Sequence, residues 1–108
     1  MLSLVIPVYK NESNLPELLR ELTTLAGGFP DVLEVVFVVD GSPDGSLALL
    51  RRMLPALGAP AQLVELSRNF GSFSAITAGL HHGRGEYFAV MAADLQEPPQ
   101  LVSAFHQL

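Results

Sequence analysis

A regular alternation of apolar, strand-like runs with amphipathic helical patterns constrains the fold more than any other feature of this sequence. Val- and Ile-rich runs without polar interruption are typical of strands covered on both faces. Between these runs, leucines or small residues recur with helical spacing. Strands are predicted at 2–8, 32–40, 61–67 and 86–92, and helices at 14–26, 47–57, 72–83 and 98–108.

This β-α-β-α-β-α-β-α order predicts an α/β fold with a doubly wound, mostly parallel sheet. Right-handed crossovers would place helices on both faces of that sheet. The carboxyl ends of parallel strands share one edge, where open α/β sheets bind their ligands. The residues that follow each predicted strand are therefore the candidates for a functional site.

Local signals refine the predicted helices. Asn14 is a plausible N-cap, with Glu17 three residues later as in a capping box, and Gly27 and Gly28 are expected to end the first helix. Pro55 predicts that the second helix ends or kinks near residues 53–54. The third helix has a small face that would allow close packing on the sheet, formed by Ala75, Ala78 and Gly79. The aromatic residues near it are interpreted as core, namely Phe70, Phe73 and Phe88.

Composition limits the function classes. The chain has 108 residues, of which 49% are hydrophobic and 16% charged, as in one small globular domain. Its formal net charge of -5 argues against a nucleic-acid partner, which would favour a basic surface. A phosphate-bearing small molecule remains compatible, because a bound metal supplies positive charge locally. With no cysteine in the chain, thiol chemistry is excluded.

Targeting signals are not evident. The apolar N-terminus lacks a basic leading segment and is interrupted by Pro7, so it is interpreted as a strand and not as a signal peptide. No apolar run approaches the roughly 20 residues needed to span a bilayer. The last helical pattern stops at "AFHQL" without a capping residue, which indicates that a longer chain was cut here.

Asp40 and Asp94 each follow an apolar run directly, at the predicted carboxyl edge of the sheet. A carboxylate at such a position can accept hydrogen bonds from a base or ribose, or it can hold a metal ion. Alternatively, each aspartate caps only the turn that follows it. The glycine-rich phosphate motifs G-x-x-x-x-G-K-[ST] and G-x-G-x-x-G are missing, so a bound pyrophosphate would need another counter-charge.

A divalent cation on Asp94 would supply that charge. Mg²⁺ and Mn²⁺ prefer oxygen ligands, and Mg²⁺ commonly combines one or two carboxylates with substrate phosphates. Gln96 lies two residues after Asp94, and in an extended segment that spacing puts both side chains on the same side. The pair is therefore a candidate metal site.

The segments "VIPVYKNESNLPELL", "VVDGSPDGS", "SRNFGSFSAITAGL" and "MAADLQEPP" together resemble the N-terminal motifs of family 2 inverting glycosyltransferases. They are most similar to the branch of dolichol-phosphate mannose synthases and bactoprenol glucosyltransferases. The resemblance implies a GT-A fold, with residues 1–108 as its nucleotide-sugar-binding part. It also implies a nucleoside-diphosphate sugar as donor, Mg²⁺ or Mn²⁺ as cofactor, and a polyprenyl phosphate acceptor. The resemblance further implies a cytoplasmic protein, which segments absent here would hold at the cytoplasmic face of the membrane.

The resemblance also implies roles for individual residues. The implied nucleotide-binding residues are Pro7, Tyr9, Glu12, Asp40, Ser42 and Arg68. The implied metal ligands are Asp94 and Gln96. The family often has Asp-x-Asp at the metal site, but Ala92 occupies the first of these positions. The family's catalytic base lies further along a longer chain. Exposed apolar surface on such a half-domain would favour a homo-oligomer.

Two other function classes are compared with this alternating pattern of strands and helices. A nucleotide-binding or interaction module without turnover would bind its ligand without depending on metal. A phosphoacceptor receiver domain shares the alternating pattern, but it needs acidic residues after the first strand and an aspartate after the third. Here those strands are followed by "PVYK" and "SRN", which makes a receiver domain a poor fit.

Overall fold

The computed structural model describes residues 1–94, in which strands and helices alternate as the sequence predicts. The helix predicted at 98–108 lies outside the described residues. In chain order the elements are β1 (Leu2–Val8), the 3-10 turn η1 (Glu12–Asn14), α1 (Leu15–Gly28), β2 (Leu33–Asp40), α2 (Ser46–Met53), the 3-10 turn η2 (Leu54–Ala56), β3 (Ala61–Leu66), α3 (Ser72–His82) and β4 (Tyr87–Val90).

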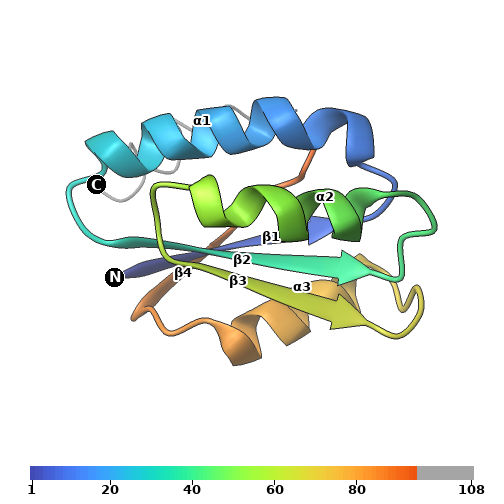
Figure 1. Cartoon of the computed structure of the whole chain (residues 1–108). Coiled ribbons are helices and arrows are strands. Elements are labelled where there is room, and N and C mark those ends of the chain that lie inside the picture. Colours follow the sequence, from blue (N-terminus) through green and yellow to red (C-terminus); the bar gives the residue numbers. More distant parts are fainter. Residues whose placement is uncertain (95–108) are drawn as a thin grey trace.

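The four strands form one sheet in the order β3-β2-β1-β4, and every neighbouring pair is parallel. Helices α1 and α2 cover one face and α3 covers the other (Figure 1). The α/β, doubly wound architecture is therefore confirmed. Strands β2 and β3 lie on one side of β1 and β4 lies on the other, so the strand order reverses at β1. In open α/β sheets this reversal point is where ligands bind.

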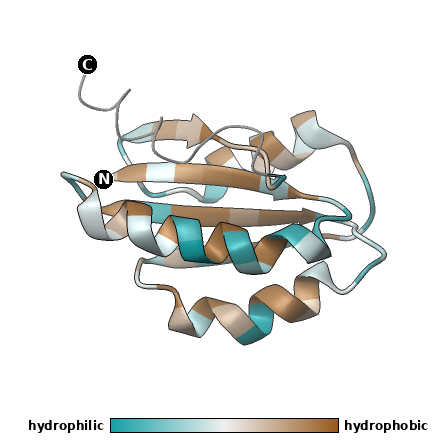
Figure 2. Cartoon of the chain, turned by 90° about the horizontal axis from the view of Figure 1, so that it is seen from above, coloured by the Kyte–Doolittle hydropathy of each residue, from teal (hydrophilic) through white to brown (hydrophobic). Residues whose placement is uncertain are grey.

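The core explains why β1 and β2 lie at the centre. All eight residues of β2 are buried, as their apolar composition on both faces requires. The larger core lies under α1 and α2 and includes Ile6, Leu18, Leu22 and Phe37. Figure 2 shows strands that are mainly brown, or hydrophobic, and helices along which hydrophilic and hydrophobic residues alternate. The two central strands thus form a rigid base for the loops at their carboxyl ends.

Helix α3 packs closely on the opposite face through its small residues, as predicted. Ala75 and Gly79 are buried there against Val5 and Val38. A Cβ added at Gly79 would overlap Val5 Cγ1 and would lie 3.1 Å from Val5 Cγ2. Only a residue without a side chain fits at this contact.

The boundaries of α1 differ from the prediction. The helix continues through Gly27 and Gly28 and does not end before them. Asn14 occupies the N-cap position, but its side chain makes no capping hydrogen bond, so the box with Glu17 is not formed. The preceding turn η1 already places Asn14 in helical conformation, and its Oδ1 accepts instead from Asn11 Nδ2 at 3.4 Å.

The interpretation of three phenylalanines as core was wrong. Phe70, Phe73 and Phe88 are 46%, 83% and 42% exposed. Helix α3 turns its small residues to the sheet, which leaves Phe73 on the outer side. Phe88 lies on β4, an outer strand of the described sheet. Within residues 1–94, no helix has the length and hydropathy required to cross a membrane.

Candidate nucleotide site

A cleft of about 330 Å³ opens at the carboxyl edge of the sheet. It lies where the strand order reverses, and four segments far apart in the sequence meet there. Its lining residues are Pro7, Val8, Tyr9, Asn11, Asp40, Asn69, Gly71, Ser72, Ala92, Ala93 and Asp94. The cleft therefore joins the predicted residues Pro7, Tyr9, Asp40 and Asp94 in one place.

Asp40 ends β2 and is only 3% exposed. One carboxylate oxygen accepts the Phe70 N–H at 2.8 Å, and the other accepts the Gly71 N–H at 3.0 Å. Asp40 thus fixes the loop after β3 against the end of β2. A carboxylate has about four acceptor positions, so these two bonds leave capacity for a ligand in the cleft.

The next residue, Gly41, brings the loops after β2 and β3 into direct backbone contact. Its φ of +61° lies in the left-handed region, which favours glycine. A Cβ at this position would overlap the backbone of Arg68 and Asn69. The glycine of "DGS" is therefore explained by the close approach of a second loop, on which Asn69 faces the cleft.

The loop after β1 forms another wall of the cleft. The Tyr9 N–H donates to Asn11 Oδ1 at 2.9 Å, and Lys10 between them has a φ of +57°. Lys10 Nζ lies 5.3 Å from the centre of the Tyr9 ring. The tyrosine is 39% exposed, so an aromatic surface and an amide are available to a ligand at this wall.

Glu12, Ser42 and Arg68 were also expected to bind the nucleotide, but they do not line the cleft. Glu12 accepts the Gly45 N–H at 2.9 Å, and the Ser42 hydroxyl donates to Asp44 at 2.5 Å. The Arg68 guanidinium lies 4.9 Å from the centre of the Phe70 ring. These three side chains occupy the same edge of the sheet, where they make contacts within and between the loops.

Asp94 is the candidate metal ligand on the described part of the cleft, while Gln96 lies outside the described residues. Among residues 1–94, no group of three or more His, Cys, Asp or Glu side chains is arranged to hold a metal ion. Ala92, which also lines the cleft, contributes no second carboxylate. This donor set fits an ion that takes most of its ligands from a bound diphosphate.

Four further residues line the cleft without having been predicted as site residues, namely Asn11, Asn69, Gly71 and Ser72. Their common signal is position, because they lie in the first residues after β1 or β3. Asn69 Oδ1 accepts the Gly71 N–H at 3.0 Å, which shapes the turn into α3. Small or amide residues directly after a predicted strand were therefore the sequence signal that could have identified them.

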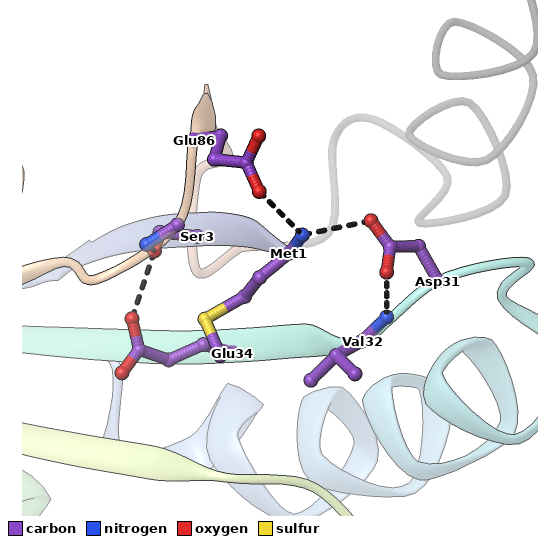
Figure 3. A network of polar contacts seen from close by, with 7 residues as sticks. Met1, Ser3, Asp31, Val32, Glu34 and Glu86 are labelled. Atoms are coloured by element: carbon purple, nitrogen blue, oxygen red, sulfur yellow. Dashed lines mark hydrogen bonds and ion pairs between the residues drawn. The ribbon is translucent and has the colours of Figure 1, made fainter.

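A second polar network lies at the opposite edge of the sheet, away from the cleft, and Figure 3 shows its contact between Ser3 and Glu34. Glu34 is 2% exposed and accepts hydrogen bonds from the Ser3 hydroxyl, the Gln62 amide and the Arg84 N–H. Burial raises the pKa of Glu34, but these hydrogen bonds outweigh it, and the pKa falls below its ordinary value. The network fastens the loop between α3 and β4 to the sheet.

Comparison with known proteins identifies this arrangement. The sequence profile described as Glycosyl transferase family 2 matches residues 3–107. The chain belongs to glycosyl transferase family 2. The match includes all the segments that form the cleft, so the cleft lies within the family's shared domain.

Among the curated family members, the chain is similar to undecaprenyl-phosphate 4-deoxy-4-formamido-L-arabinose transferases. The enzyme of Pseudomonas paraeruginosa is 41% identical over 100 residues, which cover 93% of this chain and 30% of that protein. The enzyme of Klebsiella pneumoniae is 41% identical over 98 residues, which cover 91% of this chain and 30% of that protein. The chain therefore spans less than a third of the length of these relatives.

The chain also shares its fold with solved structures. A mannosyltransferase from Pyrobaculum calidifontis, in complex with GDP-Man and Mn²⁺, superposes with a TM-score of 0.76 at 26% identity and covers 96% of this chain and 31% of that one. S. aureus TarS in complex with UDP-GlcNAc gives a TM-score of 0.78 at 25% identity, covering 98% and 31%. The parallel sheet with its flanking helices thus matches GT-A glycosyltransferase structures.

Proposed function

We propose that this chain is the nucleotide-sugar-binding part of an inverting glycosyltransferase. The observation that carries the proposal is the cleft at the reversal point of the sheet, where Tyr9, Asp40 and Asp94 converge. Support comes from the family members that are named as undecaprenyl-phosphate sugar transferases and from the neighbours solved with GDP-Man or UDP-GlcNAc. The donor is therefore a nucleoside-diphosphate sugar and the acceptor a polyprenyl phosphate.

Each wall of the cleft has a proposed role in holding the nucleoside. Pro7 and Tyr9 pack against it, because they present an apolar ring near the end of β1 and an aromatic ring directly after it. Asp40 accepts hydrogen bonds from ribose or base with the acceptor positions that Phe70 and Gly71 leave open. Asn69 and Asn11 offer amide groups to the same ligand.

The diphosphate lies toward Asp94 in this proposal. Asp94 and Gln96 hold a Mg²⁺ or Mn²⁺ ion, which stabilises the negative charge of the departing diphosphate. The contribution of the described residues is to orient the donor so that the acceptor approaches in line with the bond that breaks. The base that takes the acceptor's proton belongs to the longer chain of the family, and the lipid acceptor places the reaction at the cytoplasmic face of a membrane.

A nucleotide-binding module without turnover remains the second candidate. Its support is that the described residues alone line the cleft. The two candidates differ in the role of the metal, since a simple binding module needs no charge stabilisation on a leaving group.

Calorimetric titration with UDP and GDP, with and without Mn²⁺, tests the proposal. We expect weak metal binding to the free chain and mutual enhancement between metal and nucleotide. Asp94→Asn should abolish the enhancement, whereas Asp40→Asn should weaken nucleotide binding with or without metal. Glu17→Gln is the matched control, because Glu17 is exposed on α1 away from the cleft. If neither nucleotide binds under either condition, the proposed site is wrong.

A further inference from the structure

The loops after β1 and β2 are joined by a set of hydrogen bonds beside the cleft. We call this set the loop clamp, and it comprises Lys10, Glu12, Ser42, Asp44 and Gly45. Glu12 Oε1 accepts the Gly45 N–H at 2.9 Å, and the Glu12 N–H donates to Asp44 Oδ2 at 3.3 Å. The Lys10 N–H donates to Ser42 Oγ at 2.8 Å. The two loops are therefore bound to each other in both directions.

Asp44 is the centre of the clamp on the β2 side. Its Oδ1 accepts from the Ser42 hydroxyl at 2.5 Å and from the Ser46 N–H at 3.1 Å. Burial raises the pKa of Asp44, but the bonds from Ser42 and from the backbone of Ser46 and Glu12 outweigh it, and the pKa falls to about 2. The carboxylate is thus charged throughout the physiological range and holds the clamp closed.

Gly45 is shaped to receive the Glu12 side chain. Its φ of -83° is accessible to any residue, so backbone freedom does not explain a glycine here. A Cβ at Gly45, however, would lie 2.6 Å from Glu12 Oε2 and 2.9 Å from Glu12 Cδ. The glycine leaves the space that the Glu12 carboxylate occupies.

The clamp acts on the wall of the cleft through the chain between its contacts. Lys10 is held in the left-handed region, an uncommon conformation for a residue with a side chain. Tyr9 and Asn11, on either side of Lys10, both line the cleft, while Glu12 does not. Fixing Lys10 and Glu12 therefore fixes the two neighbours that face the ligand.

We propose that Glu12 is a positioning residue, which holds Tyr9 and Asn11 at the nucleotide cleft by binding Gly45 and does not itself touch the nucleotide. The inference rests on the proposed nucleotide site and replaces the direct role that the family resemblance implied for Glu12. Because the Glu12 carboxylate is the end of a flexible side chain, it can swing away when Gly45 is changed. Gly45→Ala should thus open the clamp without unfolding the chain.

The test measures UDP and GDP affinity of the whole chain by calorimetry in Glu12→Ala, Gly45→Ala and the double variant. A direct contact between the Glu12 carboxylate and the nucleotide predicts a larger loss in Glu12→Ala, which removes the carboxylate, than in Gly45→Ala, which only displaces it. A positioning role predicts that each single variant weakens binding by about five- to tenfold, the net effect of one ordinary hydrogen bond. The double variant should lose no more than either single variant, because both open the same clamp. Full affinity in Gly45→Ala would overturn the inference.

Three further variants sharpen the comparison. Glu12→Gln keeps an oxygen that can accept the Gly45 N–H, so it should lose less affinity than Glu12→Ala. Glu17→Ala removes the same type of charge from the exposed side of α1, and Gly27→Ala adds a Cβ where no atom lies within 4 Å. Both controls should bind as the parent chain does. An equal loss in Gln and Ala variants of Glu12 would contradict the hydrogen bond as the cause.

Amide NMR spectra of the nucleotide-free chain separate this inference from the proposed function. The signals of Tyr9, Lys10 and Asn11 should shift in both Glu12→Ala and Gly45→Ala and should stay in place in Glu17→Ala. If these signals shift but the parent chain binds no nucleotide, the proposed function fails while the clamp stands. If nucleotide binds but the signals do not move together, the clamp is wrong.

Discussion

The close packing of α3 on the sheet predicts that replacing glycine with alanine has opposite effects on stability in two helices. The change should destabilise the fold at Gly79 in α3 and stabilise it at Gly27 in α1. In a helix interior, replacing glycine with alanine stabilises by about 0.8–1 kcal/mol through backbone entropy alone. At Gly79 that gain competes with a steric cost, because the new Cβ would overlap Val5 Cγ1 and lie 3.3 Å from Val38 Cγ2. Both valines are completely buried on central strands and have no room to move aside.

Overpacking of a well-packed core costs about 1–3 kcal/mol. An overlap with a side chain fixed on two sides belongs to the upper part of that range, so Gly79→Ala should destabilise by about 1–2 kcal/mol after the helical gain is subtracted. At Gly27 no atom lies within 4 Å of the added Cβ. Because Gly27 is next to the end of α1, Gly27→Ala should stabilise by only about 0.5 kcal/mol.

Urea denaturation of both variants beside the parent chain measures these differences. The midpoint should fall for Gly79→Ala and rise slightly for Gly27→Ala, with unchanged slopes, since the surface exposed on unfolding is the same. A Gly79→Ala variant as stable as Gly27→Ala would refute the close packing of α3 on Val5.

Three other predictions concern charge and exposed surface. A pKa of about 2 for Asp44, against an ordinary 3.8, stabilises the fold above pH 3.8, and this contribution is lost as the pH falls through 2. Because Asp44 is half-exposed, about 1 kcal/mol of this stabilisation should remain after solvent screening. The stability difference between the parent chain and Asp44→Asn should therefore become smaller as the pH falls. A difference that stays constant in urea melts from about pH 6 to 2.5 would contradict this. Glu34→Ala leaves the Ser3 hydroxyl and the Arg84 N–H without an acceptor, while the Gln62 amide keeps the His82 carbonyl. The substitution should cost about 3 kcal/mol in the same assay, whereas a loss below about 1 kcal/mol would mean that water replaces the carboxylate. The exposed Phe73 and Phe88 should drive self-association that Phe73→Lys weakens, and light scattering that shows a monomer at all concentrations would count against it.

The sequence was sufficient to predict the architecture because both signals it depends on are local. Hydrophobic periodicity located every described strand and helix, and Pro55 marked the end of α2 at Met53 correctly. Pro7, Tyr9, Asp40 and Asp94 could be assigned to one edge because parallel strands all end there. The sequence did not indicate which strands are outermost, and for that reason Phe88 on β4 was mistaken for core.

The partners of the site residues could not be predicted, because they are mainly backbone amides of distant segments. No residue type marks Phe70 and Gly71 as donors to Asp40, or Gly45 as the donor to Glu12. A backbone N–H is present at almost every position, so its alignment depends on the loop conformation alone. Motif resemblance therefore grouped Glu12 with the ligand contacts, although Glu12 does not line the cleft and accepts the Gly45 N–H.

The pairing of β1 with β4 determines when the cleft comes into existence. β1 is joined to β2 early in the chain, but its other side is completed only by β4, at the end of the described residues. One wall of the cleft follows β1 and another follows β4. The wall around Asp94 therefore forms only when β4 has paired with β1, across all the chain between them. Contacts of such sequence separation are slow to form. During synthesis, a chain that has not yet extended to β4 would carry Tyr9 and Asp40 without a binding site, and nucleotide would stabilise only the completed sheet.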